Sequence, residues 1–351
     1  MLQPVKPLPL EDLKHVLEHT RELWSEARGK SFFITGGTGF FGMWLLESFA
    51  HINDQLALDM RATVLTRDSA AFAQKAPHLA TRHDLRFIQG DICSFPFPEG
   101  KFDYIIHAAS DLSGTQLQNP VNLIESTLNG CRRVVKLACD RGAKRFLFAS
   151  SGAVYGPMTE GRKHLHENAP VSAMPLQSRS AYMEAKRLGE LICSMECESH
   201  GVTATIARGF AFMGPYLPLD SHLAAPAFLQ AALCGKEIVI QGHGQTVRSY
   251  LYGADLAIWL LTILLRGEHA RPYNIGSDIP ITISQLAEST AKACGSRAGI
   301  RILGNLQPHE TAEVYLPDIN RACTELGLGV FTPFEESLKR TVLYHSPINN
   351  P

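Results

Sequence analysis

A tyrosine and a lysine four residues apart are the pair in this sequence best suited to acid–base chemistry. Tyr182 and Lys186 stand near the start of an expected helix, where the i, i+4 spacing places both side chains on one face. A lysine ammonium beside a phenol stabilises the phenolate. Such a phenol can give a proton to a developing alkoxide, or take one from a hydroxyl, during hydride transfer.

Two serines at the end of an expected strand are the next candidates. The strand at 144–150 runs into Ser150 and Ser151. A hydroxyl at the carboxyl end of a strand points into the crevice where open α/β sheets bind ligands. We expect Ser151 to hydrogen-bond the reacting oxygen. Ser150 is the alternative for this role and is also an expected substrate contact.

A glycine-rich turn follows the expected strand at 31–35 and precedes an apolar helix. Its glycines fit G-x-x-G-x-x-G: the first permits a tight turn, the second lets backbone N–H groups approach a pyrophosphate, and the third lets the helix pack on the strand. The helix N-terminus adds its positive dipole end. The turn therefore predicts a dinucleotide phosphate site. The expected contacts are Gly36, Thr38, Gly39, Phe40, Phe41 and Gly42.

The end of the second expected strand bears on the choice of cofactor. NAD-binding proteins usually carry an acid there to hold the adenine ribose, but here Thr66 takes that place and Arg67 follows. An arginine can pair with a 2′-phosphate, so NADP(H) is favoured. In the alternative, NAD(H) binds, Asp68 holds the ribose and Arg67 is a surface charge. The other expected cofactor contacts are Asp91, Ile92, Ala108, Ala109, Ser110, Tyr182 and Lys186.

Short apolar runs alternate with helical segments over the first two thirds of the chain. The expected strands are 31–35, 61–67, 85–91, 102–109, 144–150 and 202–208, and the clearest helices are 40–52, 121–141 and 180–199. Strands joined by helical crossovers indicate a parallel sheet covered on both faces. The sequence thus predicts an α/β protein with a Rossmann-type, doubly wound parallel sheet.

The same pattern divides the chain into four parts. Residues 1–29 form an expected helical arm, and 30–209 form the NAD(P)-binding domain, to which part of 245–277 returns. Residues 210–345, where proline and glycine become frequent, form a smaller, mixed α/β C-terminal substrate lobe. Residues 346–351 are an expected tail.

Bulk composition weighs against several other classes of function. The 351 residues carry a formal net charge of −1, which gives no general attraction to nucleic acid or to an anionic membrane surface. No run of about 18 apolar residues is present to span a bilayer. The eight cysteines form no C-x-x-C pair and suit free thiols in a reducing compartment. We therefore expect a cytoplasmic protein without a metal site.

The motifs, taken in order, resemble the extended short-chain dehydrogenase/reductases that act on nucleotide sugars. The resemblance covers about residues 30–345, and the group includes 4-epimerases, 4,6-dehydratases, glucuronate decarboxylases and 4-keto reductases. The matching segments are TGGTGFFG (35–42), GDI (90–92), HAAS (107–110), SSGAVYG (150–156), ENAP (167–170), YMEAK (182–186), GHGQTVRSYLYGADLA (242–257), PYNIGS (272–277) and PDINRA (317–322).

The resemblance implies a set of roles. Ser151, Tyr182 and Lys186 become the catalytic triad, and the substrate becomes a nucleoside-diphosphate sugar. Arg248 is implied to contact the diphosphate, and Tyr250 is implied to line the same pocket. A homodimer formed through the helices at about 121–141 and 180–199 is also implied.

The sequence departs from the family pattern at places that narrow the reaction. Dehydratases of this kind carry an Asp-Glu pair after the catalytic hydroxyl, and decarboxylases usually keep the Glu; here the residues are Gly152 and Ala153. This argues against both reactions, although an acid from elsewhere, such as Asp111, could substitute and contact the substrate. Ala211 and Thr127 replace asparagines that are familiar in the family, which puts the usual substrate pose in doubt.

These features predict an NAD(P)-dependent oxidoreductase that acts on a nucleotide-activated sugar. A reductase of 4-keto-6-deoxyhexoses is favoured: Tyr182 would protonate the oxyanion, Lys186 would hold the nicotinamide ribose and Ser151 would polarise the carbonyl. An epimerase with tightly held NAD is the alternative and would use the same triad. A non-catalytic nucleotide sensor is a third hypothesis, which the intact triad disfavours.

Overall fold

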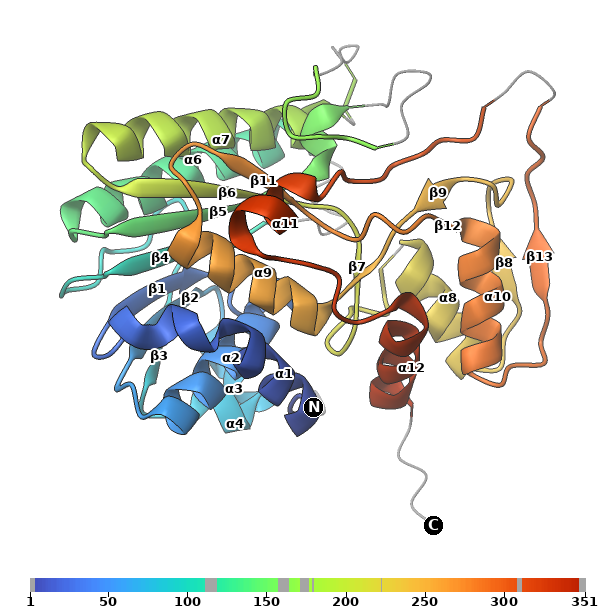
Figure 1. The fold of residues 1–351 in the computed structure, drawn as a ribbon, viewed down its shortest axis with the longest axis horizontal. Coiled ribbons are helices and arrows are strands. Elements are labelled where there is room, and N and C mark those ends of the chain that lie inside the picture. Colours follow the sequence, from blue (N-terminus) through green and yellow to red (C-terminus); the bar gives the residue numbers. More distant parts are fainter. Residues whose placement is uncertain are drawn as a thin grey trace.

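Seven strands form one parallel sheet, which occupies the larger lobe on the left of Figure 1. The computed structural model describes residues 4–110, 119–156, 164–170, 177–178, 180–221, 223–307 and 311–346. In order across the sheet, the strands are β11 (Pro272–Ile275), β6 (Thr203–Gly209), β5 (Arg145–Ser151), β4 (Tyr104–His107), β1 (Ser31–Thr35), β2 (Arg61–Thr66) and β3 (Leu85–Gln89). The doubly wound sheet predicted from the sequence is thereby confirmed.

The strand order reverses between β1 and β4. From β1 the chain builds outward to β2 and β3, and from β4 it builds in the opposite direction to β5, β6 and β11. Where the order reverses, the connections leave in opposite directions and a crevice opens at the carboxyl ends of the strands. The fold therefore places a ligand site beside Thr35 and His107, the last residues of β1 and β4.

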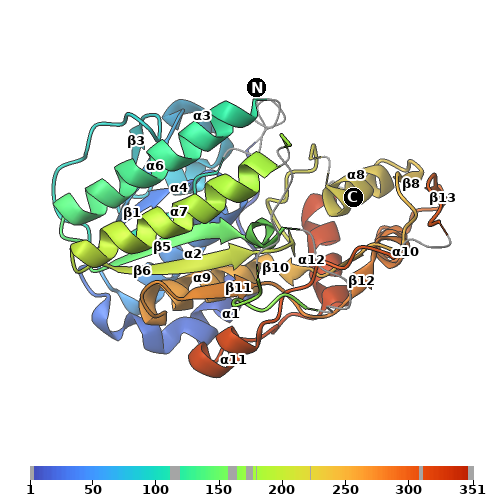
Figure 2. The same cartoon turned by 90° about the horizontal axis from the view of Figure 1, so that it is seen from above.

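Helices cover both faces of this sheet. Helices α6 (Pro120–Asp140) and α7 (Ser180–Ser199) lie together on one face, and α2 (Phe40–Leu56) and α9 (Gly253–Arg266) lie on the other (Figure 2). Strand β1 shows why: Phe32 and Ile34 pack into the α2–α9 side, whereas Phe33 between them packs into the α6–α7 side. This alternation is the two-residue period of a strand buried on both faces.

Two short helices, α3 (Ser69–Lys75) and α4 (Pro77–Ala80), connect β2 to β3, and α11 (Asn320–Leu326) lies near β11. Within the described part of the chain, no helix has the length and apolar character that a membrane span requires.

The smaller lobe, on the right of Figure 1, is built around an apolar cluster of its own. Its helices are α8 (Ala224–Leu233), α10 (Ile283–Ala293) and α12 (Phe334–His345). Three two-stranded sheets accompany them. They pair β7 (Phe212–Met213) with β10 (Leu251–Tyr252), β9 (Val247–Arg248) with β12 (Ile281–Thr282), and β8 (Ile238–Ile240) with β13 (Ile300–Ile302).

An N-terminal helical segment ties the two lobes together. It consists of α1 (Leu10–Thr20) and the 3₁₀ helix η1 (Arg21–Glu26), and it packs against α9 and α2. The buried Asp12 accepts hydrogen bonds from the Tyr252 hydroxyl at 2.7 Å and from Arg340 Nη1 at 2.6 Å. Burial raises the pKa of Asp12, and these two hydrogen bonds offset part of the rise.

Candidate active site

A cavity of about 930 Å³ lies at the carboxyl ends of the central strands and extends to the smaller lobe. At one end it is lined by the glycine-rich turn and by the ends of β2 and β3. Its middle is lined by residues from β5 and α7, and its far end by Arg248, Tyr250 and Tyr315. The expected catalytic residues and all of the expected cofactor contacts except Gly42 thus face one continuous space.

The glycine-rich turn has the backbone that its sequence predicts. Gly36 has φ +74°, and a Cβ atom there would lie 2.5 Å from the backbone carbonyl of Ala108. A side chain at Gly42 would collide with the backbone of Gly36 and Gly37, so this glycine permits the close packing of α2. Gly36 and Gly39 line the cavity, whereas Gly42 does not. Gly36 is therefore required by the conformation of the turn, and Gly42 is required by the close packing of α2.

At the end of the cavity beside β2 and β3, Asp68 has a structural role that the sequence did not indicate. Its Oδ1 accepts a hydrogen bond from Ala71 N at 2.8 Å and caps the N-terminus of α3. Thr66 and Arg67 line the cavity, and Asp68 is not among the lining residues. Asp91, Ile92, Ala108, Ala109 and Ser110 also line it, as expected for cofactor contacts.

Ser151 and Lys186 are fixed in place by backbone groups of β5 and of the 3₁₀ helix η2 (Gly152–Tyr155). Ser151 is the last residue of β5, and its Oγ accepts a hydrogen bond from Ala153 N at 3.1 Å. Lys186 is buried, and its Nζ donates to Ala149 O at 2.8 Å. The same ammonium lies 5.9 Å from the centre of the Tyr182 ring. The lysine charge is thus held beside the tyrosine at the cavity wall.

The hydroxyl of Ser150 is hydrogen-bonded to a buried carboxylate, unlike the hydroxyl of Ser151. Its hydroxyl donates to Glu190 Oε1 at 2.6 Å, and Glu190 also forms an ion pair with Arg208 at 2.7 Å. Glu190 follows Tyr182 and Lys186 at successive four-residue steps on α7, so the repeat was a signal that sequence reasoning missed. Of the two serines, Ser151 is the one whose hydroxyl is not paired with a buried charge.

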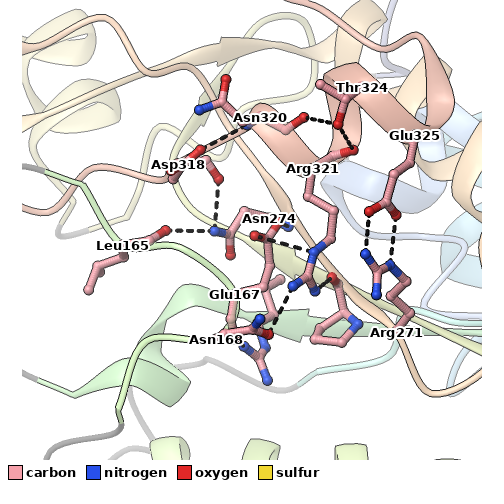
Figure 3. A network of polar contacts seen from close by, with 12 residues as sticks. Leu165, Glu167, Asn168, Arg271, Asn274, Asp318, Asn320, Arg321, Thr324 and Glu325 are labelled. Carbon is pink, nitrogen blue, oxygen red and sulfur yellow. Dashed lines mark hydrogen bonds and ion pairs between the residues drawn. The ribbon is translucent and has the colours of Figure 1, made fainter.

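A buried polar network continues from Arg208 toward the C-terminal part of the chain. Arg208 Nη1 donates to the Tyr155 hydroxyl at 3.0 Å, and that hydroxyl donates to Asn274 Oδ1 at 2.6 Å. Asn274 Nδ2 then donates to the backbone oxygens of Leu165 and Asp318 (Figure 3). Burial raises the pKa of Tyr155 to about 12, and Arg208 offsets part of this effect. The network joins β6, β11 and two irregular segments behind the cavity.

The far end of the cavity combines one arginine with two tyrosines. The Arg248 guanidinium lies 5.4 Å from the centre of the Tyr315 ring, and its Nη2 forms an ion pair with Glu313 at 3.1 Å. Tyr250 is buried, which raises its pKa to about 12 despite the nearby Arg248 charge. The sequence predicted Arg248 and Tyr250 here, but no motif pointed to Tyr315.

The structure describes two of the three further residues that the sequence singled out. Ala211 and Thr127, the two departures from familiar asparagines, both line the cavity. Asp111 lies outside the described residues. Among the described lining residues, Asp91 is the only one with a carboxylate, and it lies just after β3.

The sequence has relatives of known function over most of its length. The family described as "NAD dependent epimerase/dehydratase family" has a sequence model that matches residues 32–276. UDP-glucuronic acid decarboxylase 1 of Xenopus tropicalis is 29% identical over 327 residues, which cover 91% of this chain and 73% of that protein. The chain is therefore similar to a decarboxylase over most of its length, although Gly152 and Ala153 stand where the family pattern predicts acidic residues.

Two solved structures share the fold. DesIV, a dTDP-glucose 4,6-dehydratase from Streptomyces venezuelae solved with NAD and TYD bound, gives a TM-score of 0.74 at 23% identity and covers 90% of this chain and 96% of its own. UDP-N-acetylglucosamine 4-epimerase from Methanobrevibacter ruminantium, in complex with UDP-N-acetylmuramic acid, gives 0.75 at 23% identity and covers 90% and 98%. The resemblance inferred from the motifs is confirmed.

Proposed function

The chain belongs to the NAD-dependent epimerase/dehydratase family, and from this premise we propose that it moves a hydride between a nicotinamide cofactor and carbon 4 of a nucleotide-linked sugar. The observation that carries the proposal is the shared cavity, because the glycine-rich turn, Ser151, Tyr182, Lys186 and Arg248 all face it. A reacting carbon held in its middle would have the acid–base residues on one side and the cofactor on the other.

The cavity fits a dinucleotide at the end formed by the glycine-rich turn. The N-terminus of α2 follows this turn, so its positive dipole end supports a pyrophosphate. Gly36 leaves no room for a side chain against Ala108. We propose NADP(H) as the cofactor, with Arg67 pairing with the 2′-phosphate, because Asp68 is used as a helix cap. NAD(H) is the alternative, supported by the family description and by the NAD bound to DesIV.

The trio of Ser151, Tyr182 and Lys186 then carries out the proton transfer, with a separate role for each residue. In the direction of reduction, the Tyr182 hydroxyl gives its proton to the carbonyl oxygen as that oxygen becomes an alkoxide. Lys186, held by Ala149 O, stabilises the phenolate that remains. Ser151 donates a hydrogen bond to the same substrate oxygen and holds it toward Tyr182. Proton uptake from water restores the phenol.

We propose reduction of a 4-keto sugar as the net reaction. Elimination of water from a sugar needs an acid and a base beside the reacting carbons, and Gly152 and Ala153 supply neither. Decarboxylation is a second candidate because of the 29% identity to UDP-glucuronic acid decarboxylase 1. Once C4 is oxidised, a carboxylate at C5 can leave as CO₂ with the electrons taken up by the C4 oxygen, which the same trio would stabilise.

A turnover panel with purified protein separates these reactions. The cofactor released on denaturation is first identified by mass spectrometry. NADPH or NADH oxidation is then followed with 4-keto-6-deoxy nucleotide sugars, and CO₂ release is followed with UDP-glucuronate. We expect oxidation of the cofactor by a 4-keto sugar. Stoichiometric retained NAD with interconversion of two sugars would instead favour an epimerase, and CO₂ release would favour a decarboxylase.

We also propose that the chain forms a homodimer through α6 and α7. Leu188, Leu191 and Met195 recur on one side of α7 and are 45–60% exposed, and Val121 on α6 is 61% exposed. Exposed apolar stripes of this kind mark protein interfaces. We expect the wild-type mass by light scattering to be that of a dimer, and Leu191→Glu to give a monomer. A monomeric wild type at micromolar concentration would refute the proposal.

A further inference from the structure

Tyr315 places its hydroxyl where a side chain on the residue after Ser151 would begin. That residue is Gly152, and a Cβ atom built on it would collide with the Tyr315 hydroxyl oxygen. It would also lie 2.8 Å from two ring atoms of Phe210. The space in which a side chain at position 152 would begin is therefore filled here by a phenol from a distant part of the chain.

The backbone on both sides of Tyr315 holds it in this position. Tyr315 N donates to Val247 O at 3.0 Å, which attaches the segment to β9. The next residue, Leu316, accepts a hydrogen bond from Leu165 N at 2.8 Å, and Leu165 is in turn fixed by Asn274 in the buried network (Figure 3). The tyrosine is thus positioned by both lobes.

The ring of Tyr315 is also packed against Phe210 and Arg248. Its centre lies 4.7 Å from that of Phe210, and the Arg248 guanidinium stands 5.4 Å from the ring centre. Tyr315, Ser151, Tyr182 and Arg248 all line the cavity. The hydroxyl is therefore held between the expected catalytic serine and the expected diphosphate contact, where the sugar of a nucleotide sugar would lie.

The surroundings of this phenol keep it protonated. Burial raises the pKa of Tyr315, the neighbouring Tyr182 adds to the rise, and Arg248 offsets part of it. A protonated phenol is a neutral hydrogen-bond donor, whereas a carboxylate in the same place would be an anionic acceptor. The two groups suit different substituents: the phenol accommodates a sugar oxygen that accepts a hydrogen bond, including a sugar carboxylate, which an acid would repel.

We propose that Tyr315 contacts the substrate directly, donating a hydrogen bond to the sugar beside the reacting carbon in place of a side chain at position 152. The inference rests on the proposed function, because it assumes that a nucleotide sugar occupies the cavity. The Tyr315 phenol thus has a different role from that of Tyr182: it selects the sugar and does not exchange protons with the reacting oxygen.

Calorimetric binding of a nucleotide sugar and of its bare nucleotide tests this role. Wild type and Tyr315→Phe are titrated with UDP-glucose, UDP, dTDP-glucose and dTDP in the presence of the cofactor. We expect the variant to bind the sugar nucleotide about three- to tenfold more weakly, as the loss of one hydrogen bond implies, and the bare nucleotide unchanged. Equal loss for both, or no loss for either, would overturn the inference.

Two further variants test whether a loss of sugar affinity is specific to the Tyr315 hydroxyl. Tyr104→Phe removes another buried phenol, but on β4 and away from the cavity lining, so its binding should match wild type. Gly152→Ala pushes the Tyr315 hydroxyl aside and should reproduce the loss of sugar affinity while cofactor binding persists. If wild type binds none of the four nucleotides, the proposed function fails and this inference with it. If wild type binds them normally and Tyr315→Phe does too, only the inference fails.

Discussion

The two ends of the cavity are built in different ways. The end proposed for the cofactor is formed by the glycine-rich turn and by short segments that follow β2, β3 and β4, and the backbone conformation of the turn requires glycine at Gly36. The remainder of the cavity, which we propose holds the sugar and is called the sugar end here, is lined by Ser151, Tyr182, Arg248 and Tyr315, which come from separate elements and from both lobes. A local backbone requirement leaves a pattern in the sequence, whereas a contact between distant segments does not.

The sharpest test of the sugar end is removal of the proton donor. Tyr182→Phe leaves the ring but removes the hydroxyl, and we expect the turnover number to fall by about 10²–10⁴-fold. Cofactor affinity, measured by fluorescence titration, should stay within a factor of a few because the glycine-rich turn is untouched. Wild-type turnover in this variant would contradict the assignment, and Tyr104→Phe serves as the matched control.

The buried support of the sugar end is expected to matter for stability. Glu190→Ala leaves Arg208 without its ion-pair partner and Ser150 without its acceptor. Breaking a buried pair costs about 3–5 kcal/mol, so the free energy of unfolding in urea should fall by that amount. Glu184→Ala removes the partly exposed pair with Arg187 and should cost at most about 1 kcal/mol. Similar losses of unfolding free energy in both variants would contradict the greater importance of the buried pair.

The proposal that the adenosine of the cofactor binds beside Arg67 can be tested through cofactor selectivity. Arg67→Ala should weaken NADP⁺ binding about 10- to 100-fold, the value of a charge-assisted hydrogen bond, and leave NAD⁺ binding nearly unchanged. Arg86→Ala, an exposed arginine on the neighbouring β3, is the control and should affect neither. Equal effects on both dinucleotides, or none, would favour the NAD(H) alternative.

The smallest expected effect isolates the shape of the glycine-rich turn. Gly36→Ala and Gly29→Ala both place a side chain at positive φ, +74° and +67°, and this conformation alone should cost each about 1–2 kcal/mol in stability. Only at Gly36 does the new Cβ also meet the Ala108 backbone. We therefore expect weaker cofactor binding in Gly36→Ala alone. Unchanged cofactor affinity would show that the turn tolerates the displacement.

Much of the fold and the outline of the site could be predicted because they depend on local patterns. The alternation of short apolar strands with helices predicted the doubly wound sheet, and the spacing of Tyr182 and Lys186 on one helix face predicted their common direction. The order of the motifs also led to the family. In each case, the residues that carry the signal are close in sequence or fixed by the period of a helix or strand.

The rest depends on contacts that no local pattern contains. Asp68 fits the role of a ribose ligand equally well, and only its hydrogen bond to Ala71 N shows that it caps α3. Gly152 looks like a simple loss of an acid until Tyr315, from a segment beside β9, is seen to fill its place. Whether the space beside a glycine stays open depends on which distant residues pack there, and the local sequence does not contain that information.

Transfer of a labelled hydride tests the central claim most directly. The protein is incubated with NADPH or NADH deuterated at the transferring position and with 4-keto-6-deoxy sugars linked to UDP or dTDP, and the sugar products are analysed by mass spectrometry. We predict one deuterium at carbon 4 of the product with wild type and almost none with Tyr182→Phe. A wild-type protein that binds the cofactor and the nucleotide sugar but leaves the sugar unlabelled would contradict hydride transfer to carbon 4.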